Sequence, residues 1–237
     1  MNSPATERNS TADLLKGVAV VLMIQVHLME QFATLDVSQS TIGKVSLFLG
    51  GPPAAPVFLA VMGFFLARSR KTFFQFVRRG ALLILGGIAV NLGLNANLLY
   101  PISQGRFQLD PLAFIFGADI LPLAGLSVIA FALLREVLRH NGLAYLAAAF
   151  VVAIATPLLS NFGTHQTLTY IIPFLWGEQS WSYFPLFPWL AYTLLGVAFG
   201  TSNMIRDAFE PLSSRKKTFI SLVLFGALAF TSSFAVR

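Results

Sequence analysis

The chain has 237 residues, of which 56% are hydrophobic and only 11% are charged, and it contains no cysteine. Soluble domains carry about 25% charged residues, so this composition predicts a polytopic integral membrane protein in a lipid bilayer. The absence of cysteine excludes disulfides, thiol catalysis and cysteine-ligated metal, and with three histidines in all we expect no metal site. Lysine and arginine outnumber aspartate and glutamate by 16 to 10, but they cluster in short gaps between apolar runs, which argues against a nucleic-acid partner.

Apolar runs divide the chain and predict an all-α helical bundle with about seven transmembrane helices. No domain boundary, low-complexity tract or clear repeat separates them, so we expect a single transmembrane domain over residues 1–237. The first run is too long and too polar for a cleaved signal peptide, and we expect it to remain as the first transmembrane helix. The seven runs are 11–33, 45–67, 73–95, 112–134, 142–160, 185–202 and 218–236.

Basic residues set the predicted orientation in the membrane. Thirteen of the 16 lysines and arginines lie at the N-terminus or in the gaps after the second, fourth and sixth runs. This bias places the N-terminus in the cytoplasm, and the bacterial inner (plasma) membrane is the location that we expect. The sequence leaves open whether the protein forms a homodimer.

The first run, residues 11–32, is informative because it carries ionisable residues inside an apolar helix. At about 100° per residue, Asp13 and His27 fall on one stripe, roughly 21 Å apart along the helix axis. Ionisable groups at membrane depth usually face a bundle interior or a watery cavity, so His27 is the leading functional residue. The alternative is a histidine that is hydrogen-bonded within the bundle.

Proline and glycine interrupt two of the later runs. In the second run, Pro52, Pro53 and Pro56 follow a glycine pair, so a regular helix is expected to start only near Pro53 or Pro56. This break is either a tight turn or an irregular segment that lines a cavity. Pro185 and Pro188 likewise interrupt the start of the sixth run.

Two polar residues lie within or beside later apolar runs. Asn91 sits inside the third run, where an interhelical hydrogen bond is favoured over a substrate contact. The fourth run opens with Asp119, near the same outer level as His27, and Asp119 is either a helix-capping carboxylate or a partner that orients the histidine. The outer loop 161–184 is rich in aromatic residues, which fit an interfacial belt first and an acceptor-binding lid second.

Three stretches of the chain, taken in order, resemble a known family. They are STADLLKGVAVVLMIQVH, GGPPAAPVFLAVMGFFLA and FPLFPWLAYTLLGVAFG, and together they are similar to the heparan-alpha-glucosaminide N-acetyltransferase-like family and its bacterial relatives. The resemblance implies a membrane acyltransferase that moves an acetyl or other acyl group from cytoplasmic acyl-CoA to a sugar, or another hydroxyl or amine acceptor, on the outer side. It also implies that His27 is the active-site base, with Asp13 and Lys16 in the motif at the helix start.

Acyl transfer from a thioester needs a base, an oxyanion stabiliser and a site for the CoA phosphates. Imidazole titrates near neutral pH, so His27 can be the base, and Glu30, three residues on, can tune its charge. Asn91, or backbone N–H groups near the glycine-proline break, can stabilise the oxyanion. Positive-inside charge needs no ligand, but it also supplies the residues that we expect to bind the CoA phosphates. They are Lys16, Arg68, Arg70, Lys71, Arg78 and Arg79.

A proton-coupled transporter is the competing class of protein, in which Asp13, His27 and Asp119 would form a proton or ion relay. Broken helices in the second and sixth runs would suit that function too. A non-catalytic membrane protein is the third class. Acyl-CoA-dependent labelling of an acceptor would favour the enzyme, whereas proton-coupled uptake without acyl transfer would favour the transporter.

Overall fold

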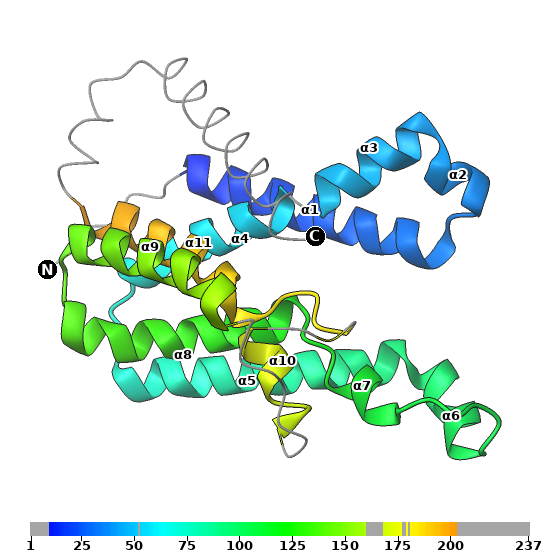
Figure 1. Ribbon diagram of the computed structural model, residues 1–237. Helices are drawn as coiled ribbons and strands as arrows, with labels where there is room; N and C mark the ends of the chain where they lie inside the picture. The colour runs from blue at the N-terminus through cyan, green and yellow to red at the C-terminus, as the bar shows by residue number, and fades with distance from the viewer. Residues whose placement is uncertain (1–9, 52, 160–167, 177–178, 180, 203–237) are drawn as a thin grey trace, which may run out of the picture. The chain divides into compact units, whose positions relative to one another are not determined.

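The computed structural model describes residues 10–51, 53–159, 168–176, 179 and 181–202, and the elements within them are all helices (Figure 1). The prediction of an all-α protein is therefore confirmed. Several helices in this part of the chain are long and apolar enough to cross a membrane, which agrees with a polytopic membrane protein. Three of the four candidate spans are single helices, Phe73–Leu94, Ile120–Leu138 and Gly142–Leu159. The fourth candidate span, Thr41–Ala67, contains a break after Gly50.

The count of seven spans and the cytoplasmic N-terminus remain predictions. The first run forms α1 (Ser10–Phe32), which is not among the four. The sixth run forms the shorter apolar helix α11 (Leu186–Thr201), and the seventh lies outside the described residues. The helices belong to two compact units, one that includes Met1–Met62 and one that spans Gly63–Arg206. The single transmembrane domain also remains a prediction.

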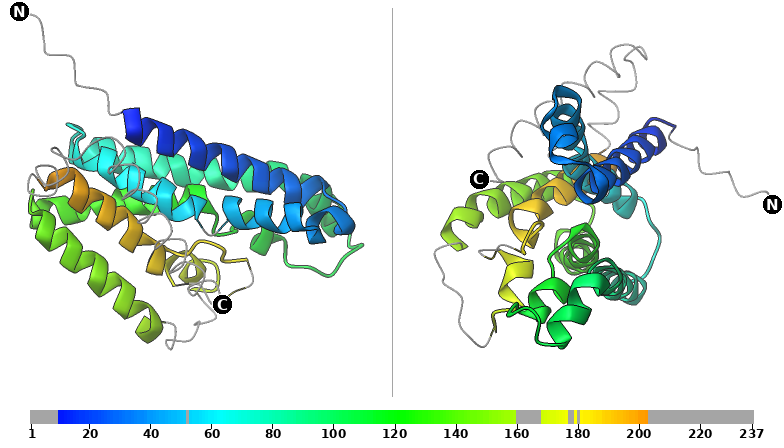
Figure 2. Two further views of the ribbon diagram at one scale, coloured as in Figure 1. Left: turned by 90° about the horizontal axis from the view of Figure 1, so that it is seen from above. Right: turned by 90° about the vertical axis from the view of Figure 1, so that its right-hand side faces the viewer.

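In the first unit, α1 and α3 (Thr41–Gly50) form a helical hairpin joined by the short helix α2 (Leu35–Gln39), as Figures 1 and 2 show. Gly50 allows the two long helices to approach closely, because a Cβ atom there would lie 2.5 Å from the Leu22 carbonyl oxygen. The same atom would lie 2.5 Å from Cβ of Val26. The hairpin thus determines which face of α1 is covered.

The helix α4 (Ala54–Ala67) begins between Pro53 and Pro56, as the sequence predicts. Before it, α3 ends at Gly50, and Gly51 has non-helical backbone angles (φ −93°, ψ −96°). Proline is tolerated in the first turn of a helix because the N–H groups there have no intrahelical partner. The break is therefore a turn between two helices, and its role in lining a cavity stays a prediction.

In the second unit, α5 (Phe73–Leu94) packs along α8 (Ile120–Leu138), and the two run side by side in Figure 1. A Cβ atom on Gly80 would lie 2.6 Å from the Gly125 carbonyl oxygen, and one on Gly125 would lie 2.5 Å from the Gly80 carbonyl oxygen. The backbones therefore touch, as small residues allow in membrane helix pairs. Beside them, α9 (Gly142–Leu159) packs mainly against α11.

One predicted boundary is wrong and one predicted break is confirmed. The sequence predicts a single run over 112–134, but the structure divides this region into α7 (Pro111–Ile115) and α8, with a non-helical stretch at 116–119. Apolar residues continue through the stretch, and hydrophobicity alone does not distinguish a buried loop from a helix. In α11, the backbone at Phe187 is non-helical (φ −98°, ψ 124°), between the two prolines that predict an interrupted start.

Candidate functional site

His27 and Glu30 form a pair on one turn of α1. The His27 Nδ1 atom lies 3.3 Å from a carboxylate oxygen of Glu30, and the two side chains are 63% and 55% exposed. A proton on Nδ1 would be donated to this carboxylate and would leave the Nε2 lone pair available to accept another proton. This arrangement suits a general base, and it brings together the two residues that the sequence pairs.

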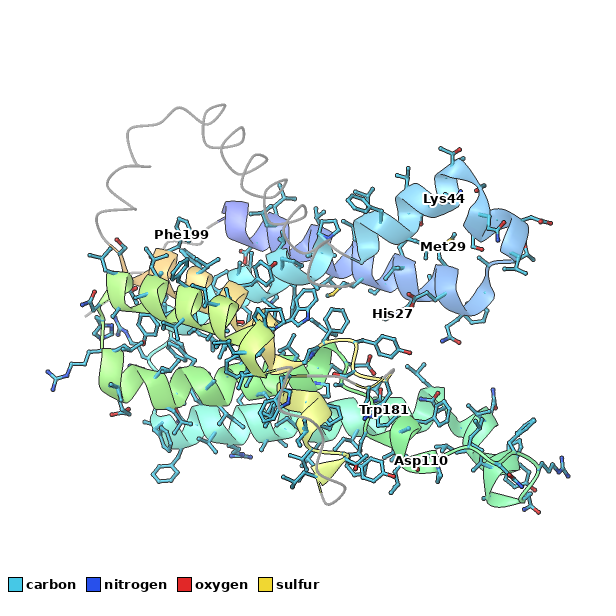
Figure 3. The ribbon with its side chains drawn as sticks, in the orientation of Figure 1. His27, Met29, Lys44, Asp110, Trp181 and Phe199 are labelled. Carbon is cyan, nitrogen blue, oxygen red and sulfur yellow. The ribbon has the colours of Figure 1, made fainter. Side chains whose placement is uncertain are left out.

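The face of α1 that carries His27 is not the face that packs on α3. Figure 3 shows His27 on the side of α1 away from α3, whereas Met29 lies between the two helices. The preceding residue, Val26, is only 6% exposed and packs near Gly50 of α3. His27 is therefore exposed, and its carboxylate partner belongs to its own helix rather than to the other arm of the hairpin.

Asp13 and Lys16 lie near the opposite end of α1 from His27. The Asp13 side chain is partly exposed and that of Lys16 is exposed. The separation of Asp13 from His27 along the helix corresponds to about 21 Å. Neither residue of the helix-start motif can therefore act directly on the imidazole.

Asn91 of α5 makes the interhelical hydrogen bonds that the sequence favours. It is only 3% exposed, and its side-chain amide donates to the carbonyl oxygens of Gly117 (3.0 Å) and Ile115 (3.4 Å). The amide therefore satisfies one carbonyl group at the end of α7 and one in the non-helical stretch between α7 and α8. In this arrangement Asn91 positions that stretch, and its part in stabilising an oxyanion stays a prediction.

Asp119 occupies the N-cap position of α8, where the sequence places a helix start, but its side chain makes no capping hydrogen bond. It lies close to Asn91 across Gly117. A Cβ atom on Gly117 would lie 3.3 Å from Asn91 Nδ2 and 3.6 Å from Asp119 Oδ2. The structure thus gathers two of the predicted site residues around one glycine. Asp119 and His27 belong to different units, and the role of Asp119 in orienting His27 stays a prediction.

Two loops join beside Asp119, and we name this region, residues 110–119 with the described part of 168–184, the loop junction. The Ala118 N–H donates to the Trp181 carbonyl (3.1 Å), and the Phe184 N–H donates to the Ala118 carbonyl (2.7 Å). The Tyr170 hydroxyl donates to the Asp110 carboxylate (2.6 Å), which raises the pKa of Tyr170 above its ordinary value. Trp181 and Asp110 are labelled in Figure 3. Main-chain and side-chain hydrogen bonds together hold the two loops against each other.

Aromatic side chains concentrate at the loop junction. The rings of Phe116 and Tyr170 lie 6.1 Å apart between centroids. The indole N–H groups of Trp176 and Trp181 are buried and have no acceptor among the described residues. Both interpretations of this loop, an interfacial belt and an acceptor-binding lid, remain predictions.

A recess of about 430 Å³ lies at one end of the α5–α8 pair, where the start of α5 meets the end of α8. Its cations come from two gaps between apolar runs, since Lys71 precedes α5, and Arg135 and Arg139 lie at the end of α8. The Arg135 guanidinium donates to the Lys71 carbonyl oxygen (3.0 Å), which ties the two gaps together. The remaining lining residues are Thr72, Phe73, Glu136 and His140.

Of the residues predicted to bind CoA phosphates, the structure brings Lys71 to this recess. Arg68 instead lies over the Phe64 ring, with its guanidinium carbon 5.1 Å from the ring centroid. This cation–π contact accounts for the position of its side chain without a ligand. The others are exposed and do not line the recess: Lys16, Arg70, Arg78 and Arg79.

Sequence reasoning did not place Arg135, Arg139 and His140 beside Lys71, because it assigned the two arginines only to membrane orientation. A usable signal existed. The gaps after the second and fourth runs are both basic and are predicted on the same side of the membrane. Residues of the two gaps can therefore be neighbours in the fold. Among the described residues, no group of three or more histidine, aspartate or glutamate side chains could hold a metal ion.

Comparison with known proteins gives one match. Residues 8–230 match the family model described as heparan-alpha-glucosaminide N-acetyltransferase, catalytic, which covers nearly the whole chain. No curated protein and no solved structure gives a significant match. The match confirms the resemblance seen in the three sequence stretches. The chain therefore belongs to the heparan-alpha-glucosaminide N-acetyltransferase catalytic-domain family, a family of membrane acetyltransferases.

Proposed function

We propose that this protein is an integral enzyme of the bacterial inner membrane that transfers the acetyl group of cytoplasmic acetyl-CoA to a hydroxyl or amine acceptor on the outer side, with a sugar as the first acceptor to test. The family match carries this proposal. The pairing of His27 with Glu30 supports it, because acyl transfer needs a base that accepts the proton of the acceptor. The basic gaps on one predicted side support a donor with phosphate groups on that side.

In the proposed reaction, His27 Nε2 accepts the proton of the acceptor while the acceptor oxygen or nitrogen attacks the thioester carbonyl. The tetrahedral intermediate then collapses, the carbon–sulfur bond breaks, and the sulfur leaves with a proton returned by the imidazolium as CoA thiol. Glu30 holds the Nδ1 proton and stabilises the imidazolium between the two steps. No net proton is gained or lost by the protein over the cycle.

The test is acetyl transfer by the purified full chain in liposomes, with labelled acetyl-CoA and a panel of amino sugars, sugars and lipid-linked alcohols. We expect His27→Ala to lower transfer by about 10²–10⁴-fold, the usual contribution of a general base. Glu30→Gln keeps a hydrogen-bonding side chain but removes the charge, so we expect a smaller loss. Gln31→Ala alters an exposed polar residue of the same helix and serves as the matched control.

Folding of each variant is checked by circular dichroism and by monodispersity in detergent. A folded His27→Ala protein that transfers acetyl groups as fast as Gln31→Ala would remove His27 from the mechanism. A wild type that transfers to none of the acceptors, yet takes up a solute in response to a proton gradient, would replace the enzyme by a transporter.

A further inference from the structure

The recess at the end of the α5–α8 pair concentrates positive charge. Lys71, Arg135 and Arg139 are three permanent cations in its lining, and Glu136 is the one acidic lining residue, so the lining carries +2 with His140 neutral, from three cations minus one anion. Glu136 forms no ion pair with a lining cation among the described residues. Like charges in one recess repel each other, and an anion from outside the chain would relieve this repulsion.

Helix dipoles explain only part of this cluster. Arg135 and Arg139 lie at the C-terminal end of α8, where a cation is favourable even without a ligand. Lys71 lies immediately before Thr72, the N-cap of α5, where the helix dipole disfavours a cation. The helix dipole therefore does not explain Lys71; membrane orientation accounts for a cation in this gap, and a bound anion would also offset the unfavourable dipole.

One cation of the recess, Arg135, is held in place by contacts within the chain, whereas the Lys71 and Arg139 side chains are exposed. The Arg135 guanidinium donates to the Lys71 carbonyl and lies 5.6 Å from the centroid of the Phe76 ring, which is fully buried. Arg139 has a positive φ of 50°, a conformation that glycine adopts far more readily than arginine. Arg139 is the C-cap residue of α8, so this conformation brings its side chain to the end of the helix beside the recess.

The first turn of α5 adds hydrogen-bond donors. The capping box of Thr72 and Gln75 satisfies the N–H groups of these two residues. The N–H groups of Phe73 and Phe74 have no intrahelical partner by their position in the first turn, and Phe73 lines the recess. Helix N-termini of this kind bind phosphate groups.

We infer that this recess binds a phosphate-bearing ligand, held by Lys71, Arg135 and Arg139 together with the start of α5. Its volume of about 430 Å³ lies within the range of small-molecule sites, about 300–1,000 Å³, so a diphosphate or nucleotide fits better than a single phosphate ion. Two sources share this chemistry: the phosphates of the CoA donor and the headgroup of an anionic phospholipid. The first source rests on the proposed function, and the site itself does not.

The test measures binding of labelled CoA and of pyrophosphate to the full chain in nanodiscs of phosphatidylcholine, which has no net charge, and repeats it with phosphatidylglycerol. We expect Lys71→Gln and Arg139→Gly each to weaken binding about tenfold to a hundredfold, the usual effect of losing a charge-assisted hydrogen bond. Arg139→Gly also relieves the positive φ, so its thermal stability should equal or exceed that of the wild type. Arg106→Gln removes one exposed cation elsewhere and is the matched control.

CoA binding in phosphatidylcholine that is weakened by the two recess variants and not by Arg106→Gln supports the site with the donor as its ligand. Pyrophosphate binding that depends on the same variants and is displaced by phosphatidylglycerol, without CoA binding, supports the site with a lipid headgroup. Binding that none of the recess variants alters, or that Arg106→Gln weakens equally, overturns the inference. Absence of acetyl transfer alongside variant-sensitive binding would refute the proposed function and leave the site standing.

Discussion

The contact between α5 and α8 offers a direct test of how tightly this bundle is packed. Replacing Gly80 by alanine puts a methyl group 2.6 Å from the Gly125 carbonyl oxygen, which is backbone and cannot rotate away. Gly86 lies on the same helix, and a Cβ atom there would meet nothing within 4 Å. Both substitutions gain the same helix propensity, about 1 kcal/mol, so the difference between them isolates the steric effect.

We expect Gly80→Ala to be less stable than Gly86→Ala by about 1–3 kcal/mol, the usual effect of overpacking a well-packed contact. The free energy of unfolding is measured by reversible denaturation with sodium dodecyl sulfate in mixed micelles, followed by circular dichroism. Gly125→Ala should reproduce the loss, because its Cβ atom would lie 2.5 Å from the Gly80 carbonyl oxygen. If Gly80→Ala is as stable as Gly86→Ala, the backbones do not touch and the described packing of α5 on α8 is refuted.

Two further predictions concern hydrogen bonds at the loop junction. Asn91→Ala leaves the Gly117 carbonyl without its donor, and we expect a loss of about 1–2 kcal/mol in the same unfolding assay; unchanged stability would contradict this role. The proton of Tyr170 makes its bond to Asp110, so this contact is complete below the ordinary pKa of 10.0 and is lost as pH rises through the raised value. The ultraviolet titration curve of the wild type, after subtraction of the curve of Tyr170→Phe, should have its midpoint above pH 10.0. A midpoint at or below pH 10.0 would refute the hydrogen bond.

Local chemistry made the helix class and two chain breaks predictable. Pro53 and Pro56 determine where α4 can begin, and the prolines around Phe187 interrupt α11, since each acts through its own backbone. That Asn91 would hydrogen-bond to another part of the chain was also predictable, because a buried amide in an apolar helix needs a partner. Its actual acceptor, Gly117, was not, because that depends on how α5 and α8 pair.

The recess shows the limit of sequence reasoning more clearly. Lys71 was predicted as a phosphate ligand from its position in a basic gap, but its neighbours Arg135 and Arg139 come from another gap far along the chain. Nothing in either gap alone specifies that they meet. The pairing follows from the glycines at positions 80 and 125, whose spacing determines how the two helices align. The sequence predicts on which side of the membrane the basic residues lie. Which of them lie together depends on the packing of α5 on α8.

The backbone pairing of Ala118 has a consequence for biogenesis. Its N–H and C=O groups are satisfied by Trp181 and Phe184, which are synthesised after α8 and α9. When α5 and α8 enter the bilayer, these partners have not yet left the ribosome, and unpaired peptide groups are costly in hydrocarbon. Until these partners are synthesised, water at the membrane surface or the insertion machinery must therefore hydrogen-bond to the N–H and C=O groups of Ala118. A chain whose translation stops after α9 would therefore lack both backbone partners of Ala118.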